Sequence, residues 1–183
     1  MQYVAQTGNF RAAGCEYTGA FRILRVILNY DYLWMNLRVL GGAYGCMSAF
    51  RRSGESYLVS YRDPHLKRTL EVYRNLPDYL KNFQADERTM TKYIIGAISE
   101  LDTPLNASAK GDLAMTSWFA GLTEEDFQKE REEVLDAQPE DIRKLSAAAQ
   151  AILDADNRGV IGSESVLEKD GDVLSVIRPL VQG

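Results

Sequence analysis

Residues 36–50 have the sequence NLRVLGGAYGCMSAF, and this stretch decides the fold because an apolar helical pattern ends in it and a strand begins. Gly41 and Gly42 predict the end of the helix, since glycine readily takes the positive φ values that close a helix and lets another backbone approach closely. Arg38 lies before the glycine pair and Tyr44 after it. We therefore expect a guanidinium and a phenol at one helix-to-strand corner, where they are placed to grip a peptide.

The segment before this corner predicts a strand and a long helix. A short strand that includes Tyr3 ends at the turn Gly8-Asn9. From Glu16 to about Val39, apolar residues recur at helical spacing, which predicts a helix with a wide apolar face against a sheet. These apolar positions are Ala20, Phe21, Leu24, Ile27, Leu28, Leu33, Trp34 and Leu37.

The segment after the corner predicts a hairpin followed by a helix. Residues 43–50 and 56–61 are rich in β-branched, aromatic and small residues, and the turn-like residues 51–55 join them into two antiparallel strands. Pro64 is expected at the first position of the next helix, because proline is favoured there. Pro77 interrupts that helix, and a second piece follows it.

The second half of the chain is predicted to be mainly helical. Asp86 is a helix cap, and Thr123 with Asp126 comes close to a capping box. Pro139 is expected to begin a further helix. Residues 159–162 are expected to form a short buried strand.

This order of elements predicts a two-layer α/β sandwich of the α+β class, with a small mixed or antiparallel sheet and helices on one face. The 183 residues, 45% of them hydrophobic, favour one compact domain that covers residues 1–183. A flexible tail is expected from about Gly171.

Charge and cysteine content restrict the partners and the compartment. A formal net charge of -5 argues against a nucleic-acid binder or a basic membrane-surface protein, because neutralising phosphates needs concentrated Lys and Arg. We therefore expect no nucleic-acid partner and no membrane partner. Cys15 and Cys46 are too few and too far apart for a disulfide framework, and we expect buried free thiols.

Several kinds of catalytic site lack their residues in this sequence. His65 is the single histidine, so neither His-Glu-x-x-His nor its inverse His-x-x-Glu-His occurs, and we expect no zinc site and a surface or capping role for His65. The serines lack a Gly-x-Ser-x-Gly setting. Residues 41–45, GGAYG, follow a helix and precede a strand, which is opposite to the order of a phosphate-binding loop.

The acidic run, Arg38 and Tyr44 each have an ordinary structural interpretation. The acidic run 130–133 contains a basic residue, which is typical of a solvated helix face. Arg38 in a last helical turn suits the helix dipole, and Tyr44 could belong to the core. From the residues alone, these interpretations and a functional one remain equally open for Arg38 and Tyr44.

Short motifs occur in a specific order between residues 29 and 135, within a likeness to known proteins that extends from Tyr3 to Gly162. They are NYDYLW (29–34), LRV (37–39), GGAYG (41–45), SYRDP (60–64), TKYIIG (91–96), LDTP (101–104), SAKG (108–111) and EEVL (132–135). In this order they resemble the C-terminal domain of presequence protease-like members of the pitrilysin/insulinase family of zinc peptidases.

The resemblance implies a peptidase of four related α/β domains, two in each half, whose halves close over an unfolded peptide. It implies a metalloprotease (LuxS/MPP-like) fold for this chain, as the fourth domain. Zinc, its His-x-x-Glu-His ligands and the general base would belong to the first domain. This chain would then hold no metal or cofactor and would be inactive by itself.

The resemblance also implies roles for the two residues at the corner. Arg38 would hold a peptide carbonyl of the substrate. The Tyr44 hydroxyl would hydrogen-bond the polarised scissile carbonyl and stabilise charge that develops during attack by zinc-bound hydroxide. These roles require both side chains at one open face of the sheet edge, with Tyr44 outside the core.

We therefore expect a C-terminal non-catalytic domain of a zinc metallopeptidase that degrades unfolded peptides, with the catalytic N-terminal half of the same peptidase and unfolded peptides as its partners. One alternative is a free-standing peptide-binding or scaffold protein without catalytic activity. Another is a separate subunit that pairs with a zinc-bearing half. The expected compartment is the cytoplasm in a bacterium and an organelle matrix in a eukaryote.

Overall fold

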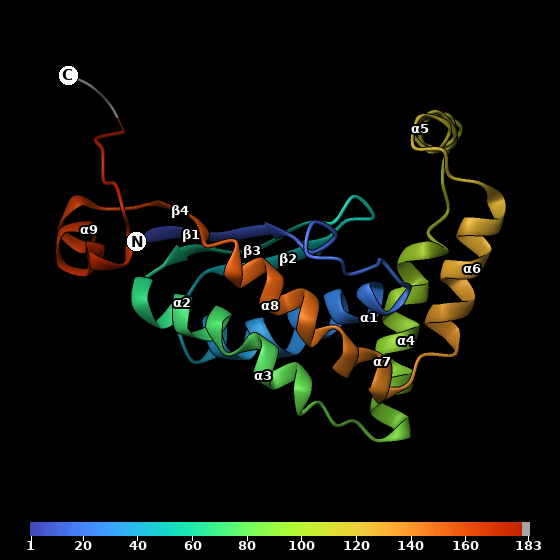
Figure 1. Ribbon diagram of the computed structural model, residues 1–183, viewed down its shortest axis with the longest axis horizontal. Helices are drawn as coiled ribbons and strands as arrows, with labels where there is room; N and C mark the ends of the chain where they lie inside the picture. The colour runs from blue at the N-terminus through green and yellow to red at the C-terminus, as the bar shows by residue number, and fades with distance from the viewer. Residues whose placement is uncertain (181–183) are drawn as a thin grey trace.

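A computed structural model describes residues 1–180, which form two layers (Figure 1). One layer is a four-stranded sheet within these residues, with the strand order β2-β3-β1-β4 and every neighbouring pair antiparallel. The strands are β1 (Gln2–Asn9), β2 (Gly45–Phe50), β3 (Glu55–Asp63) and β4 (Asn157–Ile161). Helices cover one face of the sheet, which confirms the predicted α+β sandwich.

The helical layer begins with one long helix of mixed type. The α-helix α1 (Ala20–Ile27) continues as two π-helical segments, η1 (Leu28–Tyr32) and η2 (Trp34–Val39). The predicted start at Glu16 is wrong, because the backbone of Gly19 packs against the helix α6 (Glu124–Leu135): a Cβ on Gly19 would lie 2.5 Å from the Glu130 carbonyl oxygen. The π-helical turns were not predicted.

The remaining helices follow the hairpin. Figure 1 shows α1, α2, α3 and α8 beneath the sheet, α4 and α6 at one end, and α5 apart from the body. Their bounds are α2 (Leu66–Arg74), α3 (Leu76–Lys81), α4 (Glu87–Leu101), α5 (Ala107–Phe119), α6 (Glu124–Leu135), α7 (Pro139–Lys144), α8 (Ser146–Asp154), α9 (Glu164–Asp170) and the 3-10 helix η3 (Gly171–Val173).

The start of α2 differs from the prediction. Pro64 is not the first helical residue, because the Asp63 carboxylate accepts hydrogen bonds from the His65 backbone N–H (2.9 Å) and from the Thr69 hydroxyl (2.6 Å). These bonds hold an extended connection, and the helix begins at Leu66 with His65 at its N-cap.

Two features of the last quarter also differ. The helix predicted from Pro139 is divided at Leu145, whose N–H bonds to the Ile142 carbonyl (3.1 Å) in a tight turn between α7 and α8. The strand predicted to be buried is β4, an edge strand with mostly exposed residues. Its exposure follows from its place, since it has a neighbouring strand on one side only.

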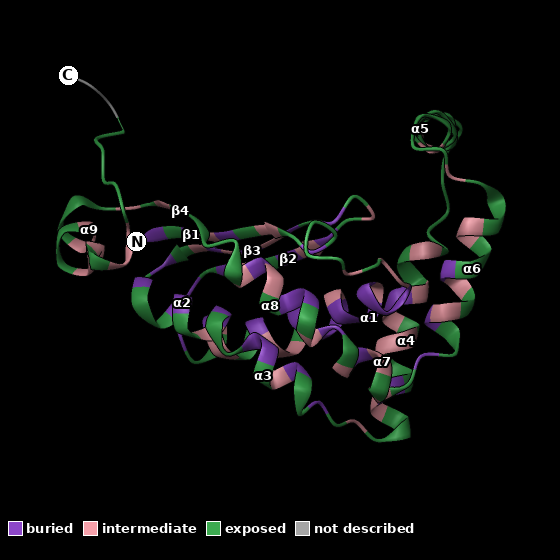
Figure 2. Ribbon diagram, viewed as in Figure 1, coloured by how far each residue is buried: buried purple, intermediate pink, exposed green. Residues whose placement is uncertain are grey.

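The core lies between the sheet and the helices beneath it (Figure 2). Val4 of β1, Leu58 of β3, and Leu24 and Ile27 of the long helix belong to this one core, and each is 1% exposed or less. Burial of a side chain of this size stabilises the fold by about 1.5–3 kcal/mol. The buried Tyr73 hydroxyl donates to the Val4 carbonyl (3.2 Å), which satisfies the polar group of this otherwise apolar residue.

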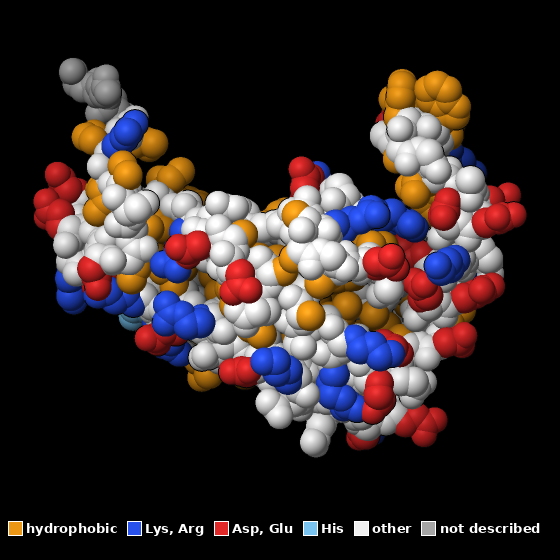
Figure 3. Space-filling model, viewed as in Figure 1, with side chains coloured by type: hydrophobic (Ala, Val, Ile, Leu, Met, Phe, Trp, Pro, Cys, Tyr) orange, Lys and Arg blue, Asp and Glu red, His pale blue; other side chains and the backbone are white. Residues whose placement is uncertain are grey.

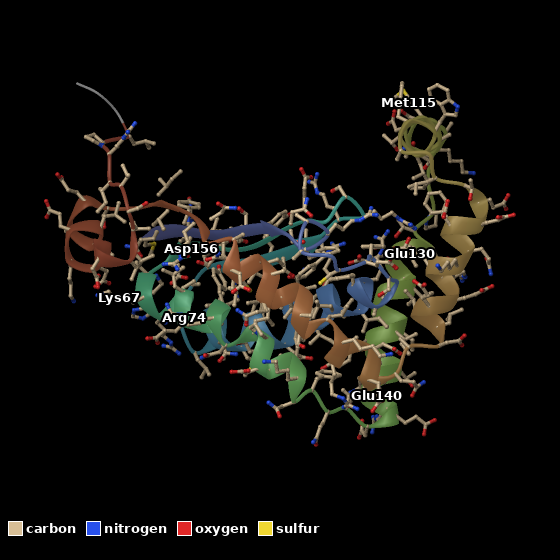
Figure 4. The ribbon with its side chains drawn as sticks, in the orientation of Figure 1. Lys67, Arg74, Met115, Glu130, Glu140 and Asp156 are labelled. Atoms are coloured by element: carbon tan, nitrogen blue, oxygen red, sulfur yellow. The ribbon has the colours of Figure 1, made fainter. Side chains whose placement is uncertain are left out.

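Glu130 of α6 is buried, so the prediction of a solvated face is wrong at this residue. Its side chain is 2% exposed, and its carboxylate accepts hydrogen bonds from the Tyr17 hydroxyl (2.6 Å), from Arg22 Nε (2.7 Å) and from Arg52. Burial acts to raise the pKa of Glu130, but the hydrogen bonds from Arg22 and Tyr17 and the charges of both arginines lower it below its usual value. The carboxylate therefore ties α6 to α1 and to the β2–β3 turn (Figure 4).

We predict that Glu130→Gln lowers the free energy of unfolding by about 2–4 kcal/mol at neutral pH, because it leaves two guanidinium groups without their counter-charge. Urea denaturation followed by circular dichroism measures this loss. Glu132→Gln, at an exposed position of the same helix, is the control and should change stability by less than about 0.5 kcal/mol.

The pH dependence has a definite sign. Because the pKa of Glu130 is lowered by folding, its stabilisation is complete above the unfolded value of about 4.3 and is lost as the pH falls through the folded value. The difference between the wild type and Glu130→Gln should therefore shrink in acid. A difference that stayed constant down to about pH 3 would contradict this account.

Candidate functional site

The end of the long helix positions Arg38. In η2 the hydrogen bonds span five residues, as from the Leu40 N–H to the Met35 carbonyl (2.9 Å), and such widened turns are frequent at functional sites. Arg38 lies in the last turn, above Trp34, with its guanidinium carbon 4.5 Å from the indole centroid. This cation–π contact fixes the direction of the arginine side chain.

Gly41 and Gly42 end the helix as predicted, but for two different reasons. Gly42 has a φ of 77°, a left-handed conformation that favours glycine. At Gly41 space is the constraint, because a Cβ there would lie 2.5 Å from the Leu37 carbonyl oxygen. That same oxygen accepts the Ala43 N–H (2.9 Å), so the chain turns directly from the helix toward β2.

Tyr44 directly precedes β2, which is an edge strand of the sheet, and lies outside the core. Its side chain is 57% exposed, and its carbonyl oxygen accepts a hydrogen bond from Arg38 Nη1. Its ring centroid lies 5.6 Å from that of Tyr61, which covers Gly45 on the sheet face away from the helices. The structure thus brings Arg38 and Tyr44 together beside the open face, and their role in binding substrate stays a prediction.

Arg62 belongs to the same corner and was not singled out from the sequence. Its guanidinium carbon lies 5.4 Å from the Tyr44 ring centroid, and that of Arg38 lies 5.6 Å from it. Within residues 1–180 neither arginine forms an ion pair. Arg62 has a φ of 49°, which its place in the motif SYRDP did not indicate. A shallow hollow at this corner is lined by Met1, Arg38, Gly42, Ala43, Tyr44 and Arg62.

The face of the sheet opposite the helices is apolar and uncovered. Side chains alternate along each strand, so the residues between the buried ones point to this open face. They form rows across the strands, and several are exposed or half-buried. Pairs on this face include Met47 opposite Val59, Val59 opposite Ala5, Tyr3 opposite Ile161 and Gly45 opposite Tyr61, together with the more polar pair of Thr7 and Tyr57. In the space-filling view this side of the molecule is hollowed between α5 and the C-terminal part (Figure 3).

The two cysteines are free thiols, as predicted, but each is half-buried where full burial was expected. Burial raises the pKa of the Cys46 thiol to about 11, although the charge of the nearby Arg38 opposes this shift. The thiol is therefore protonated at neutral pH, which makes it a poor nucleophile.

The described residues do not fit a zinc site. Among residues 1–180, no group of three or more His, Cys, Asp and Glu side chains is placed to hold a metal ion. His65 is exposed at the N-cap of α2. No reaction step through a metal is derived from these residues.

Two solved structures share this fold. A solved protein described as a zinc protease from Bordetella pertussis superposes with a TM-score of 0.64 and 16% identity, over 89% of this chain and 94% of that one. The inactive peptidase domain of a protein described as a zinc protease from Bordetella parapertussis gives a TM-score of 0.62 and 17% identity, over 89% of this chain and 91% of that one.

Comparison of the sequence with known families shows the family of this chain. Residues 1–161 match the PreP C-terminal domain, and the chain belongs to this family. It is 45% identical over 182 residues to protein HypA of Clostridium perfringens, covering 100% of this chain and 19% of that protein. It is 34% identical over 155 residues to presequence protease 1, chloroplastic/mitochondrial, of Arabidopsis thaliana, covering 84% of this chain and 14% of that protein.

The chain therefore spans a fifth or less of the length of these relatives. The resemblance that the sequence motifs indicated is confirmed, because the matched family is that of the presequence protease C-terminal domain. Within residues 1–180, no helix is both long enough and apolar enough to cross a membrane.

We predict that Gly45→Ala destabilises the fold by about 1–3 kcal/mol, because the new Cβ would lie 2.4 Å from the Tyr61 ring and displace it. Gly159→Ala is the matched control, since that position in β4 has no atom within 4 Å of a new Cβ. It should be neutral or slightly stabilising. Chemical denaturation measures both, and equal effects would show that Tyr61 does not need the space above Gly45.

Proposed function

We propose that this chain is the C-terminal, non-catalytic domain of a longer zinc metallopeptidase and that its open sheet face forms part of the chamber that encloses an unfolded peptide. Membership of the PreP C-terminal domain family supports this proposal, as does the small share of the relatives that the chain spans. The observation that carries it is the exposed Tyr44, which Arg38 holds at the corner of an uncovered apolar sheet face.

The open face suits an unfolded peptide of variable sequence. Apolar contact is non-directional, so rows of aliphatic and aromatic side chains can accept many different peptides. Three exposed or half-buried tyrosines on this face, Tyr3, Tyr57 and Tyr61, add hydroxyl groups that can bind a peptide backbone. The fully buried sheet face opposite is filled by the helices and cannot take this role.

Arg38 and Tyr44 supply directed hydrogen bonds at one edge of the face. One N–H group of Arg38 is used to hold the Tyr44 carbonyl, and a guanidinium has four more donors for a substrate carbonyl. The Tyr44 hydroxyl would donate to the carbonyl of the bond to be cleaved. A donor that is held in place in this way acts on the charge that develops on that oxygen and is worth about a hundred- to a thousandfold in rate.

The zinc ion and its ligands would lie in the preceding part of the longer protein, which we propose as the partner of this domain. The unfolded peptide would be bound between the two. By this proposal the isolated chain cleaves no peptide. The compartment follows the source, being the cytoplasm in a bacterium and an organelle matrix in a eukaryote.

We predict that Tyr44→Phe and Arg38→Ala each lower kcat/KM for cleavage of an unfolded peptide by the longer protein, Tyr44→Phe by about a hundred- to a thousandfold. The loss in Tyr44→Phe should fall mainly on kcat, because the hydroxyl acts on charge that develops during the reaction. Tyr30→Phe, at an exposed tyrosine of the same long helix, is the control and should stay within about twofold of the wild type.

Two experimental outcomes would contradict the proposal. If cleavage is unchanged in both Tyr44→Phe and Arg38→Ala while both variants keep the wild-type thermal midpoint, the two residues are not part of the site. If the reading frame upstream of Met1 encodes no His-x-x-Glu-His segment and the chain binds peptides alone, it is a free-standing binding protein.

A further inference from the structure

α5 is a helix that its own domain leaves uncovered. It lies apart from the sheet and the other helices (Figure 1), and none of its residues is buried (Figure 2). Trp118 is 76% exposed, Phe119 74% and Met115 54%. The Met115 side chain points away from the body (Figure 4), and hydrophobic side chains gather at the tip that α5 forms (Figure 3).

The apolar residues of α5 lie on more than one side of the helix. Gly111, Ala114 and Trp118 are spaced three and four residues apart and share one face with Met115, while Leu113 lies on the opposite side. Its two charged residues, Lys110 and Asp112, are of opposite sign. Its largest apolar side chains, Met115, Trp118 and Phe119, share one broad face, and such a face is normally buried against another element.

The chain nevertheless builds α5 as an ordered helix. The Asn106 side chain caps its start by accepting the Ala109 N–H (2.9 Å). Its end is closed by a bond from the Leu122 N–H to the Ser117 carbonyl (2.9 Å), with Gly121 at a φ of 66°. A helix of 13 residues is marginal in water by itself, so packing of its apolar face against a partner would stabilise it.

The base of α5 is fixed to the body. Asp102 after α4 and Arg131 of α6 form a two-pronged ion pair, with Arg131 Nη2 3.0 Å from Asp102 Oδ2. α4 packs against α6 and α6 is tied to α1 through Glu130 and Arg22. The apolar helix is therefore presented from a firm support.

We propose that α5 is the docking helix with which this domain packs against the polypeptide that precedes it in the longer protease, with the apolar sides of the helix buried in that contact. This inference rests on the proposed function, because it requires the longer protein. About four-fifths of the Clostridium perfringens relative lies outside the region that this chain matches. That preceding polypeptide is present in every copy of the longer protein and can cover α5 permanently.

The charge of α5 favours a protein partner over a lipid surface. Helices that lie on membranes carry a strongly basic polar face, whereas α5 has one lysine and one aspartate. Its small residues, among them Gly111 and Ala114, permit close approach of another backbone, and its large ones supply the buried area. A second copy of this chain and a lipid surface are the other occupants that the experiment must detect.

Hydrogen–deuterium exchange tests the proposal, with the amides of residues 107–119 compared in the longer protein and in the 183-residue chain. We expect exchange in the longer protein to be slower by at least about tenfold at these amides, and unchanged at the buried amides of α1. Equal exchange in the two proteins would overturn the proposal. So would protection in the 183-residue chain that rises with concentration together with a dimer mass, or protection that needs phosphatidylglycerol vesicles.

Variants separate docking from folding. Trp118→Ser in the longer protein should remove most of the protection of residues 107–119, whereas Ile95→Ser, at an exposed position of α4, should leave it intact. In the 183-residue chain Trp118→Ser should not change the thermal midpoint, because this side chain is not buried there. If Trp118→Ser leaves the protection intact, α5 is not the docking helix.

The docking proposal and the assignment of Arg38 and Tyr44 to the site are tested by independent results. Tyr44→Phe should lower cleavage and leave α5 protected. If cleavage is unaffected by Tyr44→Phe while α5 is protected in the longer protein, the site assignment fails and the docking helix stands. If cleavage falls but α5 exchanges freely, the docking proposal fails and the site stands.

Discussion

The candidate site at Arg38 and Tyr44 depends on the close approach of the end of the long helix to the edge strand β2. The Leu37 carbonyl accepts the Ala43 N–H, and Gly41 has no room for a side chain because that carbonyl lies beside it. This turn lets Arg38, on the helix, bind the carbonyl of Tyr44, before the strand. Two side chains from different elements are thereby held in one place without the help of a ligand, so a substrate would meet groups that are already ordered.

The helices pack on one face of the sheet only, so the corner of Arg38 and Tyr44 lies beside an open face. The helices fill one face of the sheet, and the rows of side chains on the other face remain uncovered. At the opposite end of the molecule, the buried Glu130 carboxylate joins α6 to α1 and to the β2–β3 turn, and α4 and α6 together support α5. The domain thus has an apolar face beside its predicted site and an apolar helix at its far end, and both are surfaces that a larger protein would enclose.

The sequence predicted features that depend on local chemistry. The glycine pair, the Asp86 cap and the Thr123–Asp126 capping box all act within a few residues, and all are present. The motifs that gave the family also singled out Arg38 and Tyr44, which the structure brings together. The burial of Glu130 could not be predicted, because its partners are 78 to 113 residues away along the chain. The π-helical turns and the left-handed conformation of Arg62 were not predicted either.

The most direct test is a structure of the longer protein closed around an unfolded peptide. The account predicts that the Tyr44 hydroxyl oxygen lies at hydrogen-bond distance, about 2.7 Å, from a carbonyl oxygen of the peptide, with Arg38 bonded to the same segment. A closed structure in which Tyr44 is covered by another domain, or lies more than about 6 Å from any peptide atom, would contradict it.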